Sequence, residues 1–392
     1  MPRPARTEFP PPVLVTDTVS LAALCERLRR EPFVTIDTEF MRERTYYPEL
    51  CVVQLAGIGD VAVIDAQAPG MDLAPLGALL ADGAVVKVFH AARQDAEIFL
   101  ELFGAVPTPL FDTQVAAMVA GFGDQVGYDS LVASLTGGHI DKAHRFSDWS
   151  ARPLSAAQVA YAAADVTFLR GVYETLCARL RSDGRLDWVS EEMAVLAEPS
   201  TYRADPETIW ERLRPRTGNR RMLGLLRAAA AWREREAQRV NIPRGRLLKD
   251  ETLLEIAALA PATADELARA RGVTRGFAEG KSGVGLLAAL AEARALPDGA
   301  LPEAPRKDGP RASPALVSLL KVLLAAKSEE HQVAPRLLAS SEDLDRLATE
   351  AAPEIPALRG WRSEVFGTDA LALKAGRIAL GVDGKRVKLL RS

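Results

Sequence analysis

Short runs of apolar and β-branched residues, separated by turn signals, fill much of the first ninety positions. The runs FVTIDTEF (33–40), CVVQLAGIG (51–59), VAVIDA (61–66) and VVKVFH (85–90) have the length and composition of buried strands. The first three predict an antiparallel meander. A helical period begins at residue 91, which predicts that later strands alternate with helices. The pattern therefore favours an α/β domain with a mixed sheet.

Helical periodicity governs most of the remaining sequence. It predicts helices over 91–104, about 110–120 and about 155–181, and beyond residue 205 the pattern is almost entirely helical. The stretch 297–314 contains five prolines and is typical of an interdomain linker. Two helical domains are therefore expected after the α/β domain.

The chain ends in a segment that alternates apolar and polar residues on both sides of Asp383-Gly384. This dipeptide is a strong two-residue turn signal. The pattern predicts a small terminal hairpin.

Length and composition exclude several classes of protein. The chain has 392 residues, of which 48% are hydrophobic and 26% charged, so neither a single small module nor a disordered chain is expected. It has no apolar run long enough to span a membrane, and the prolines of its first twelve residues do not fit a secretory signal. Cys25, Cys51 and Cys177 are isolated, which fits a reducing compartment and provides no zinc motif. We expect a cytoplasmic protein.

Charge is distributed unevenly between the two halves of the chain. Residues 1–200 hold 16 basic and 27 acidic residues, a net charge of −11, whereas residues 201–392 have a net charge of +8. A dense basic stretch, 203–249, holds 13 basic and 5 acidic residues. Such a stretch attracts polyanions, although a solvated helical face has the same composition.

Two acidic residues occur at the end of the first predicted strand. Asp37 and Glu39 are two positions apart, so their side chains lie on the same face of the strand. Carboxylates held together beside a buried strand raise each other's pKa unless a cation or a shared proton relieves the repulsion. A hard divalent metal ion would relieve this repulsion. Taken alone, however, the motif is more often explained by two solvated acids at the end of a strand.

Two helices supply further candidate residues. Asp95 lies near the start of the helix after VVKVFH, on the stripe of Ile98 and Phe99. Tyr161 and Asp165 are four residues apart in the helix over about 155–181 and share one face. Taken singly, Asp95 fits a helix N-terminal acid, and the Tyr161–Asp165 pair fits an ordinary core hydrogen bond.

Together these segments point to metal-dependent chemistry. Asp37, Glu39, Asp95 and Asp165 can converge at one end of the sheet and hold two Mg²⁺ or Mn²⁺ ions about 4 Å apart through oxygen ligands. Such a centre is suited to phosphodiester hydrolysis. Tyr161 would hold or deprotonate the attacking water, and the holding role is the better supported, because a phenol is ordinarily too weak an acid to serve as a base near neutral pH.

These residues carry a resemblance to a known family. Asp37-x-Glu39, Asp95 in FHAARQDAEIF and Tyr161-x-x-x-Asp165 resemble the three motifs of the tyrosine subclass of the DEDD exonuclease superfamily. The runs TEFMRERTYYPELCVVQLA, PLFDTQVAA and DKAHRFSDWSARPLS resemble the ribonuclease D family in particular, over roughly residues 15–200. The resemblance implies a ribonuclease H-like fold, two divalent metal ions and release of 5′-mononucleotides from RNA 3′ ends, chiefly those of 3′-extended transfer RNA.

Weaker predictions concern residues that contact the substrate. Phe40, Gln54 and His90 lie beside the signature positions and are candidates to contact the terminal nucleotides, although packing explains Phe40 and His90 as well. Residues from about 210 to 296 resemble the HRDC domain, a nucleic-acid-binding helical module, and 312–370 resemble a diverged second copy. The predicted phosphate contacts are Arg220, Arg221, Arg244, Arg246 and Lys249.

The sequence thus predicts a ribonuclease H-like α/β exonuclease domain followed by two all-α HRDC-type domains. The expected boundaries are an exonuclease domain over 1–205, a first HRDC domain over 206–298, a linker over 299–312, and a second HRDC-like domain with the terminal hairpin over 313–392. We expect a monomer that binds RNA and no membrane. Two alternatives remain open: the same hydrolysis on DNA, and a noncatalytic nucleic-acid-binding scaffold.

Overall fold

The computed structural model describes residues 9–141, 143–303 and 312–391. These residues form two compact units. The first comprises the chain as far as Glu39, the range Leu50–Thr201 and the residues from 312 onward, and the second comprises Phe40–Glu49 and residues 202–303. No helix among these residues combines the length and the hydrophobicity that crossing a membrane requires.

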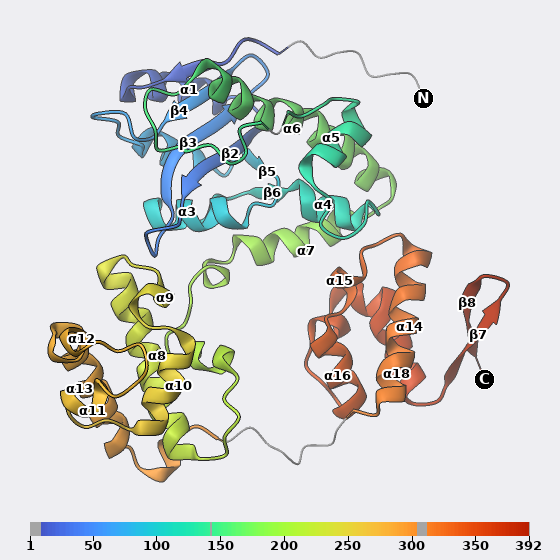
Figure 1. Ribbon diagram of the computed structural model, residues 1–392. Helices are drawn as coiled ribbons and strands as arrows, with labels where there is room; N and C mark the ends of the chain where they lie inside the picture. The colour runs from blue at the N-terminus through green and yellow to red at the C-terminus, as the bar shows by residue number, and fades with distance from the viewer. Residues whose placement is uncertain (1–8, 142, 304–311, 392) are drawn as a thin grey trace. The chain divides into compact units, whose positions relative to one another are not determined.

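A six-stranded mixed sheet forms the centre of the N-terminal part of the first unit (Figure 1). Its strands are β1 (Val13–Val15), β2 (Phe33–Met41), β3 (Glu49–Ala56), β4 (Val61–Asp65), β5 (Val86–Phe89) and β6 (Leu110–Asp112). Their spatial order is β1-β4-β3-β2-β5-β6. Strands β3 and β4 pair antiparallel, whereas β2 with β5, β5 with β6 and β1 with β4 pair parallel. Strand β2 therefore lies in the middle of the sheet, flanked by β3 and β5.

Within the described residues up to Thr201, seven α-helices and one short 3₁₀ turn accompany the sheet. They are α1 (Thr18–Leu28), α2 (Ala74–Leu80), α3 (Arg93–Phe103), α4 (Thr113–Val119), α5 (Tyr128–Thr136), α6 (Ala156–Ser182), α7 (Leu186–Ala197) and η1 (Pro199–Thr201). The predicted long helix is confirmed as α6, which begins with a capping box between Ser155 and Gln158. The helix predicted over about 110–120 is wrong at its start. Residues 110–112 extend the sheet as β6, and Asp112 caps α4.

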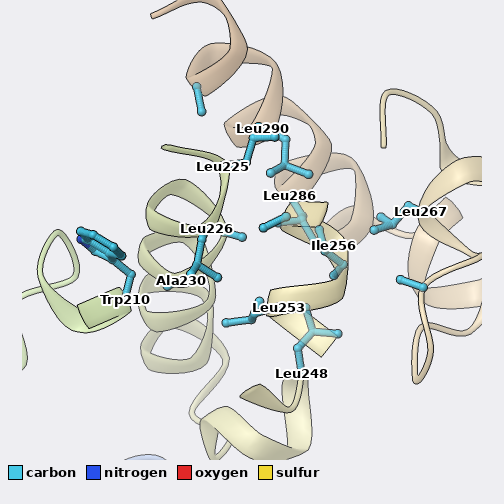
Figure 2. Close-up of a cluster of buried hydrophobic side chains, with 14 of the residues drawn as sticks. Trp210, Leu225, Leu226, Ala230, Leu248, Leu253, Ile256, Leu267, Leu286 and Leu290 are labelled. Atoms are coloured by element: carbon cyan, nitrogen blue, oxygen red, sulfur yellow. The ribbon is translucent and has the colours of Figure 1, made fainter. Parts of the chain in front are cut away.

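The second unit is helical and has its own apolar core. Its elements are η2 (Ile209–Leu213), α8 (Arg220–Val240), α9 (Arg244–Leu247), α10 (Asp250–Leu259), α11 (Ala264–Leu267), α12 (Arg275–Glu279), α13 (Lys281–Ala295) and η3 (Asp298–Ala300). Figure 2 shows Trp210, Leu226, Leu253, Ile256 and Leu286 within the cluster of buried side chains that joins these helices. Burial of such a cluster is the main source of the domain's stability.

One feature of this unit concerns the predicted linker. The first residues of the predicted linker, 299–312, belong to the helical domain, because Leu301 is buried and its carbonyl accepts a hydrogen bond from Arg220 at 2.8 Å. Residues 304–311 of that linker lie outside the described residues.

The C-terminal part of the first unit is helical and ends in a hairpin. Its elements are α14 (Pro314–His331), α15 (Pro335–Leu338), α16 (Ser341–Thr349), η4 (Pro356–Leu358), α17 (Gly360–Arg362), the π-helical turn η5 (Ser363–Gly367), α18 (Thr368–Lys374), β7 (Ile378–Asp383) and β8 (Arg386–Arg391). Strands β7 and β8 pair antiparallel, with Asp383 opposite Arg386. The predicted terminal hairpin is therefore confirmed.

The two helical regions repeat one local arrangement. The C-cap residue is Asn241 in α8 and Gln332 in α14, and both have a left-handed backbone with φ of 51°. A one-turn helix, α9 or α15, follows each cap. The next helix begins nine residues after the cap in both regions, at Asp250 and at Ser341.

Candidate active site

The two acids of the first motif lie on the central strand of the sheet. Strand β2 is buried from Phe33 to Ile36, and its exposure increases at Asp37 and Glu39, which are partly buried. Because side chains alternate along a strand, both carboxylates lie on one side of β2, and Thr38 lies on the other. The sheet thus fixes the two acids next to each other at the point where the strand leaves the core.

Helix α6 brings a third carboxylate to this pair. One carboxylate oxygen from each of Asp37, Glu39 and Asp165 lies within 4.8 Å of the others. Val166 and Leu169, the neighbours of Asp165 on the helix, are buried and hold α6 against the sheet. The backbone carbonyl of Asp165 also accepts a hydrogen bond from the Tyr128 hydroxyl at 2.7 Å. Packing and this hydrogen bond therefore fix the position of the third acid.

Asp95 lies close to this group without joining it. It occupies the first turn of α3, is 6% exposed, and accepts a hydrogen bond from the Thr38 hydroxyl at 2.5 Å. It is not part of the three-carboxylate cluster, although its charge acts on both Asp37 and Glu39. The structure thus brings three of the four predicted ligands within direct reach of one ion and places the fourth beside them.

Burial and mutual repulsion strongly perturb these acids. Burial raises the pKa of Glu39 to about 9, and the charges of Asp37, Asp165 and Asp95 add to the shift. Burial raises the pKa of Asp165 to about 7. The pKa values of Asp37 and Asp95 are raised well above the ordinary carboxyl value by burial first and by neighbouring carboxylates second. These groups cannot all be ionised near neutral pH without added positive charge.

The donor set fits divalent metal ions. The three clustered side chains offer only oxygen, which Mg²⁺ and Mn²⁺ prefer, and no cysteine or histidine belongs to the cluster. A bound cation would replace the protons that the raised pKa values otherwise demand. The residues present therefore fit a metal centre held by Asp37, Glu39 and Asp165, with Asp95 at its edge.

A cavity of about 390 Å³ opens over the acids. Its walls are formed by Asp37, Thr38, Glu39, His90, Gln114, Gly127, Tyr128, Asp129, Ile140, Arg145, Tyr161, Asp165 and Leu169. Tyr161 lines the cavity on the same helix as Asp165. Its pKa is raised, by burial first and then by the charges of Asp165, Glu39 and Asp37, while Arg145 opposes the shift. The phenol is therefore protonated at neutral pH in the metal-free protein, which favours a role as hydrogen-bond donor.

Besides Thr38 of β2, four polar wall residues were not among the site residues predicted from the sequence: Gln114, Tyr128, Asp129 and Arg145. These four come from helix starts and a loop whose positions in the sequence carry no periodic signal. Arg145 belongs to DKAHRFSDWS, a run that supports the family resemblance, and this membership was the available hint. Arg152 of the neighbouring segment has a structural role instead, since its guanidinium binds both carboxylate oxygens of Asp65 at 2.7 and 2.8 Å.

The predicted nucleotide-contact residues occupy different environments. His90 lines the cavity, and its Nε2 atom is buried without a hydrogen-bond partner in the described part of the protein. Burial lowers the pKa of His90, so the ring is neutral near pH 7. Gln54 is completely buried within β3 and does not line the cavity. Phe40 is partly buried at the end of β2. Contact of any of the three with substrate stays a prediction.

In the helical unit, two predicted phosphate contacts are already engaged within the protein. Arg220 donates to the carbonyls of Leu301 and Pro302 at 2.8 and 3.1 Å. Arg221 donates to the carbonyl of Leu296 at 2.6 Å and pairs with Asp298 at 2.5 Å. Both arginines thus hold the end of the domain against α8, and this geometry does not support phosphate contact by them.

The other three basic residues lie around the α9 turn. Arg244 and Lys249 line a cavity of about 420 Å³ together with Arg212 and the buried Arg233. Arg246 and Lys249 are exposed. Asp250 and Glu251 also line this cavity. Arg233 pairs with Asp250 at 2.8 Å, and Arg244 pairs with the buried Glu234 at 3.2 Å. Arg246 and Lys249 are therefore the better candidates for phosphate contact at the α9 turn.

Comparison with protein families identifies both kinds of domain. The family model described as 3′-5′ exonuclease matches residues 12–181, and the HRDC domain model matches residues 222–290. Ribonuclease D of Granulibacter bethesdensis is 74% identical over 392 residues, which covers all of this chain and 99% of that protein. Ribonuclease D of Gluconacetobacter diazotrophicus is 73% identical over 389 residues, covering 99% of each chain.

A solved structure agrees with these matches. The crystal structure of Escherichia coli RNase D, described as an exoribonuclease involved in structured RNA processing, superposes with a TM-score of 0.80 at 31% identity. The match covers 94% of this chain and 99% of that chain. The similarity therefore extends across the exonuclease and helical domains.

Proposed function

Because the chain belongs to the ribonuclease D family, and is thus a hydrolytic 3′-5′ exoribonuclease, we propose that it trims the 3′ ends of precursor transfer RNAs and other structured RNAs. The products are 5′-mononucleotides. The observation that carries this proposal is the convergence of Asp37, Glu39 and Asp165 within 4.8 Å beneath an open cavity. The same family membership argues against a noncatalytic scaffold.

The four acids hold the metal centre in this proposal. Two divalent ions would lower the pKa of the attacking water and stabilise the leaving 3′ oxygen. Asp37, Glu39 and Asp165 supply the ligand oxygens, and the sheet and α6 keep them in place before substrate arrives. Asp95 completes the set, and its bond to Thr38 fixes the direction of its carboxylate. This prior organisation lowers the cost of assembling the reacting groups.

Tyr161 and Arg145 act on the reacting end of the strand. The protonated phenol of Tyr161 donates a hydrogen bond that orients the attacking water, which is consistent with its raised pKa. Arg145 is the cation of the cavity wall and binds the scissile phosphate, whose negative charge the surrounding acids would otherwise repel. His90 offers its unpaired Nε2 to the terminal nucleotide.

The helical domains bind the body of the RNA. Arg244, Arg246 and Lys249 at the α9 turn contact backbone phosphates without reading sequence. We also propose that the C-terminal helical domain is a diverged second copy of the HRDC module. The repeated left-handed cap, one-turn helix and nine-residue spacing support this assignment. The enzyme acts as a monomer in the cytoplasm.

A degradation assay tests the proposed reaction. A 3′-extended transfer RNA precursor labelled at its 5′ end would be shortened stepwise by the parent protein and not in EDTA, with 5′-mononucleotides as products. Asp165→Asn would abolish this shortening, because the amide binds the metal poorly. Products with 3′-phosphates, or an Asp165→Asn protein as fast as the parent, would contradict the mechanism. Faster degradation of a matching DNA than of the RNA would favour the DNA alternative.

A further inference from the structure

Asp112 is a buried acid that the proposed reaction does not use. It is 3% exposed, ends β6 and caps α4. Its Oδ1 accepts hydrogen bonds from the backbone N–H groups of Gln114 at 2.8 Å and Val115 at 3.4 Å, as an N-cap does. Capping of its own helix accounts for only part of its contacts.

The remaining contacts of Asp112 reach a second helix. Its Oδ1 also accepts from the N–H of Ala91 at 3.0 Å, and its Oδ2 accepts from the N–H of Ala92 at 2.9 Å. These residues directly precede α3, which has no side-chain cap of its own. A single carboxylate therefore accepts hydrogen bonds at the start of two helices.

The turn that Asp112 holds is conformationally demanding. Ala91 has a φ of +60°, a left-handed conformation that is unfavourable for a residue with a side chain. The bonds to Asp112 offset this cost and fix where α3 begins. Asp95 follows three residues after Ala92, in the first turn of α3. Displacement of the turn would therefore displace the Asp95 carboxylate.

Thr113, the neighbour of Asp112, holds the other side of the same turn. Its hydroxyl donates to the carbonyl of Phe89 at 3.0 Å and lies 3.0 Å from Nδ1 of His90. The Asp112-Thr113 pair thus fixes the chain from Phe89 to Ala92 from both ends. This segment carries the His90 ring into the cavity and leads directly to Asp95.

We propose that Asp112 is a positioning residue that sets the Asp95 carboxylate for metal binding, by clamping the strained turn before α3. This inference rests on the proposed metal-dependent function of the site. Asp112 does not itself touch substrate or metal. Its loss should leave the fold intact and displace the Asp95 carboxylate from its position for metal binding. Residues that position metal ligands in this way typically contribute about 10- to 100-fold to metal affinity or activity.

Two substitutions separate the clamp from the ordinary helix cap. Asp112→Ser keeps a side-chain oxygen that caps α4, but its single short hydroxyl cannot also hold Ala91 and Ala92. Asp112→Asn keeps the size of the side chain and loses one of the two acceptor oxygens. The matched control is Asp17→Ser, which alters another aspartate N-cap of the same domain, at the start of α1.

The experiment measures Mn²⁺ binding by electron paramagnetic resonance, thermal unfolding in EDTA, and the kcat and KM for RNA. For Asp112→Ser we expect the Mn²⁺ dissociation constant to rise and kcat to fall by about 10-fold or more, with KM changed less than about twofold. Asp112→Asn should lie between this variant and the parent. Asp17→Ser should leave the unfolding temperature, Mn²⁺ binding and kcat close to those of the parent, because serine caps a helix about as well as aspartate.

Each outcome is decisive. If Asp112→Ser binds Mn²⁺ and turns over RNA as the parent does, the inference is overturned. The same holds if its losses match those of Asp17→Ser. Failure of the proposed function looks different, because the parent itself would then bind no Mn²⁺ and Asp95→Asn would turn over RNA unchanged.

Discussion

Asp37, Glu39 and Asp165 are brought together at an energetic cost that a cation relieves. Each carboxylate is partly or wholly removed from water and lies near others of the same charge, so its pKa rises. A protein under selection for stability alone would replace such a group with apolar side chains. The persistence of three acids around one point therefore indicates a function for the charge. Tyr161, whose pKa the same acids raise, is better suited to orient water than to remove its proton.

The raised pKa values predict how pH affects the metal-free protein. In the unfolded chain these carboxyls titrate near their ordinary values, whereas in the folded protein Asp165 titrates at about 7 and Glu39 at about 9. Between these limits the folded state binds more protons than the unfolded chain. The two carboxyls therefore contribute to the free energy of unfolding at acidic pH, and this contribution is lost as pH rises toward 9. In EDTA, the unfolding temperature should fall from pH 5.5 to pH 9.

A paired substitution isolates this effect from other titrations. The Glu39→Gln/Asp165→Asn protein lacks both titrating groups, so its unfolding temperature should fall less over the same pH range. Mn²⁺ should raise the unfolding temperature of the parent most at alkaline pH. An equal pH dependence in the parent and the double variant, measured by calorimetry, would contradict the assignment.

Tyr161 gives a second test at the scale of single residues. Tyr161→Phe removes the hydroxyl and keeps the ring, which lies about 6.0 Å from the Trp149 ring. Loss of one hydrogen bond to a charged or developing-charge group should lower kcat by about 10- to 100-fold. Because the hydroxyl orients water and does not titrate, the shape of the pH–rate profile should be unchanged. Loss of an alkaline or acidic limb of that profile would instead assign Tyr161 as the base.

At the scale of elements, the sequence predicts best where periodicity is long or residues form motifs. Strand β2 and helix α6 follow from FVTIDTEF and from the uninterrupted pattern of 155–181. These two elements carry four of the five signature residues, namely Asp37, Glu39, Tyr161 and Asp165. Strand β6 was missed because three residues are too few to show a period of two. Arg145 and Tyr128 could not be placed, since only tertiary packing brings a loop and a helix start to the cavity wall.

The segment before α6 provides a test at this scale. Arg152 binds Asp65 of β4 through two hydrogen bonds, and also donates to the carbonyls of Trp149 and Cys51. Arg152→Lys loses the two-pronged geometry and leaves acceptors unpaired, so we expect a loss of about 1.5–3 kcal/mol in the free energy of unfolding. Urea denaturation measures it. The control is Arg181→Lys, at an exposed arginine of α6 for which the described residues show no ion pair, and it should change the free energy of unfolding little. Equal losses in the two variants would contradict the role of Arg152 as an anchor of this segment.

At the scale of the whole molecule, the chain separates acid from base along its sequence. The acidic half contains the cluster of Asp37, Glu39 and Asp165, and the basic half contains the α9 turn and the helical regions. Bound metal ions would offset part of the negative charge of the first half, and the positive charge of the second half would attract RNA phosphates. This division explains how an enzyme with a net charge of only −3 can bind a polyanion.

Salt dependence tests the contribution of the basic half. Arg246→Ala with Lys249→Ala should weaken RNA binding and reduce the slope of log affinity against log salt concentration by about 1.4, since each contact to a single strand contributes about 0.7. Fluorescence anisotropy with catalytically inactive Asp165→Asn protein as the background measures both quantities. Arg269→Ala, at an exposed arginine outside the α9 cavity, is the control. An unchanged slope in the double variant would remove the α9 turn from the RNA-binding surface.

The most direct measurement is anomalous diffraction from crystals of the protein soaked in MnCl₂. The account predicts manganese peaks bound by carboxylate oxygens of Asp37, Glu39 and Asp165, and their loss in Asp165→Asn crystals. Crystals that show manganese elsewhere and none among these three acids would contradict the central claim that they form the metal centre of the exonuclease.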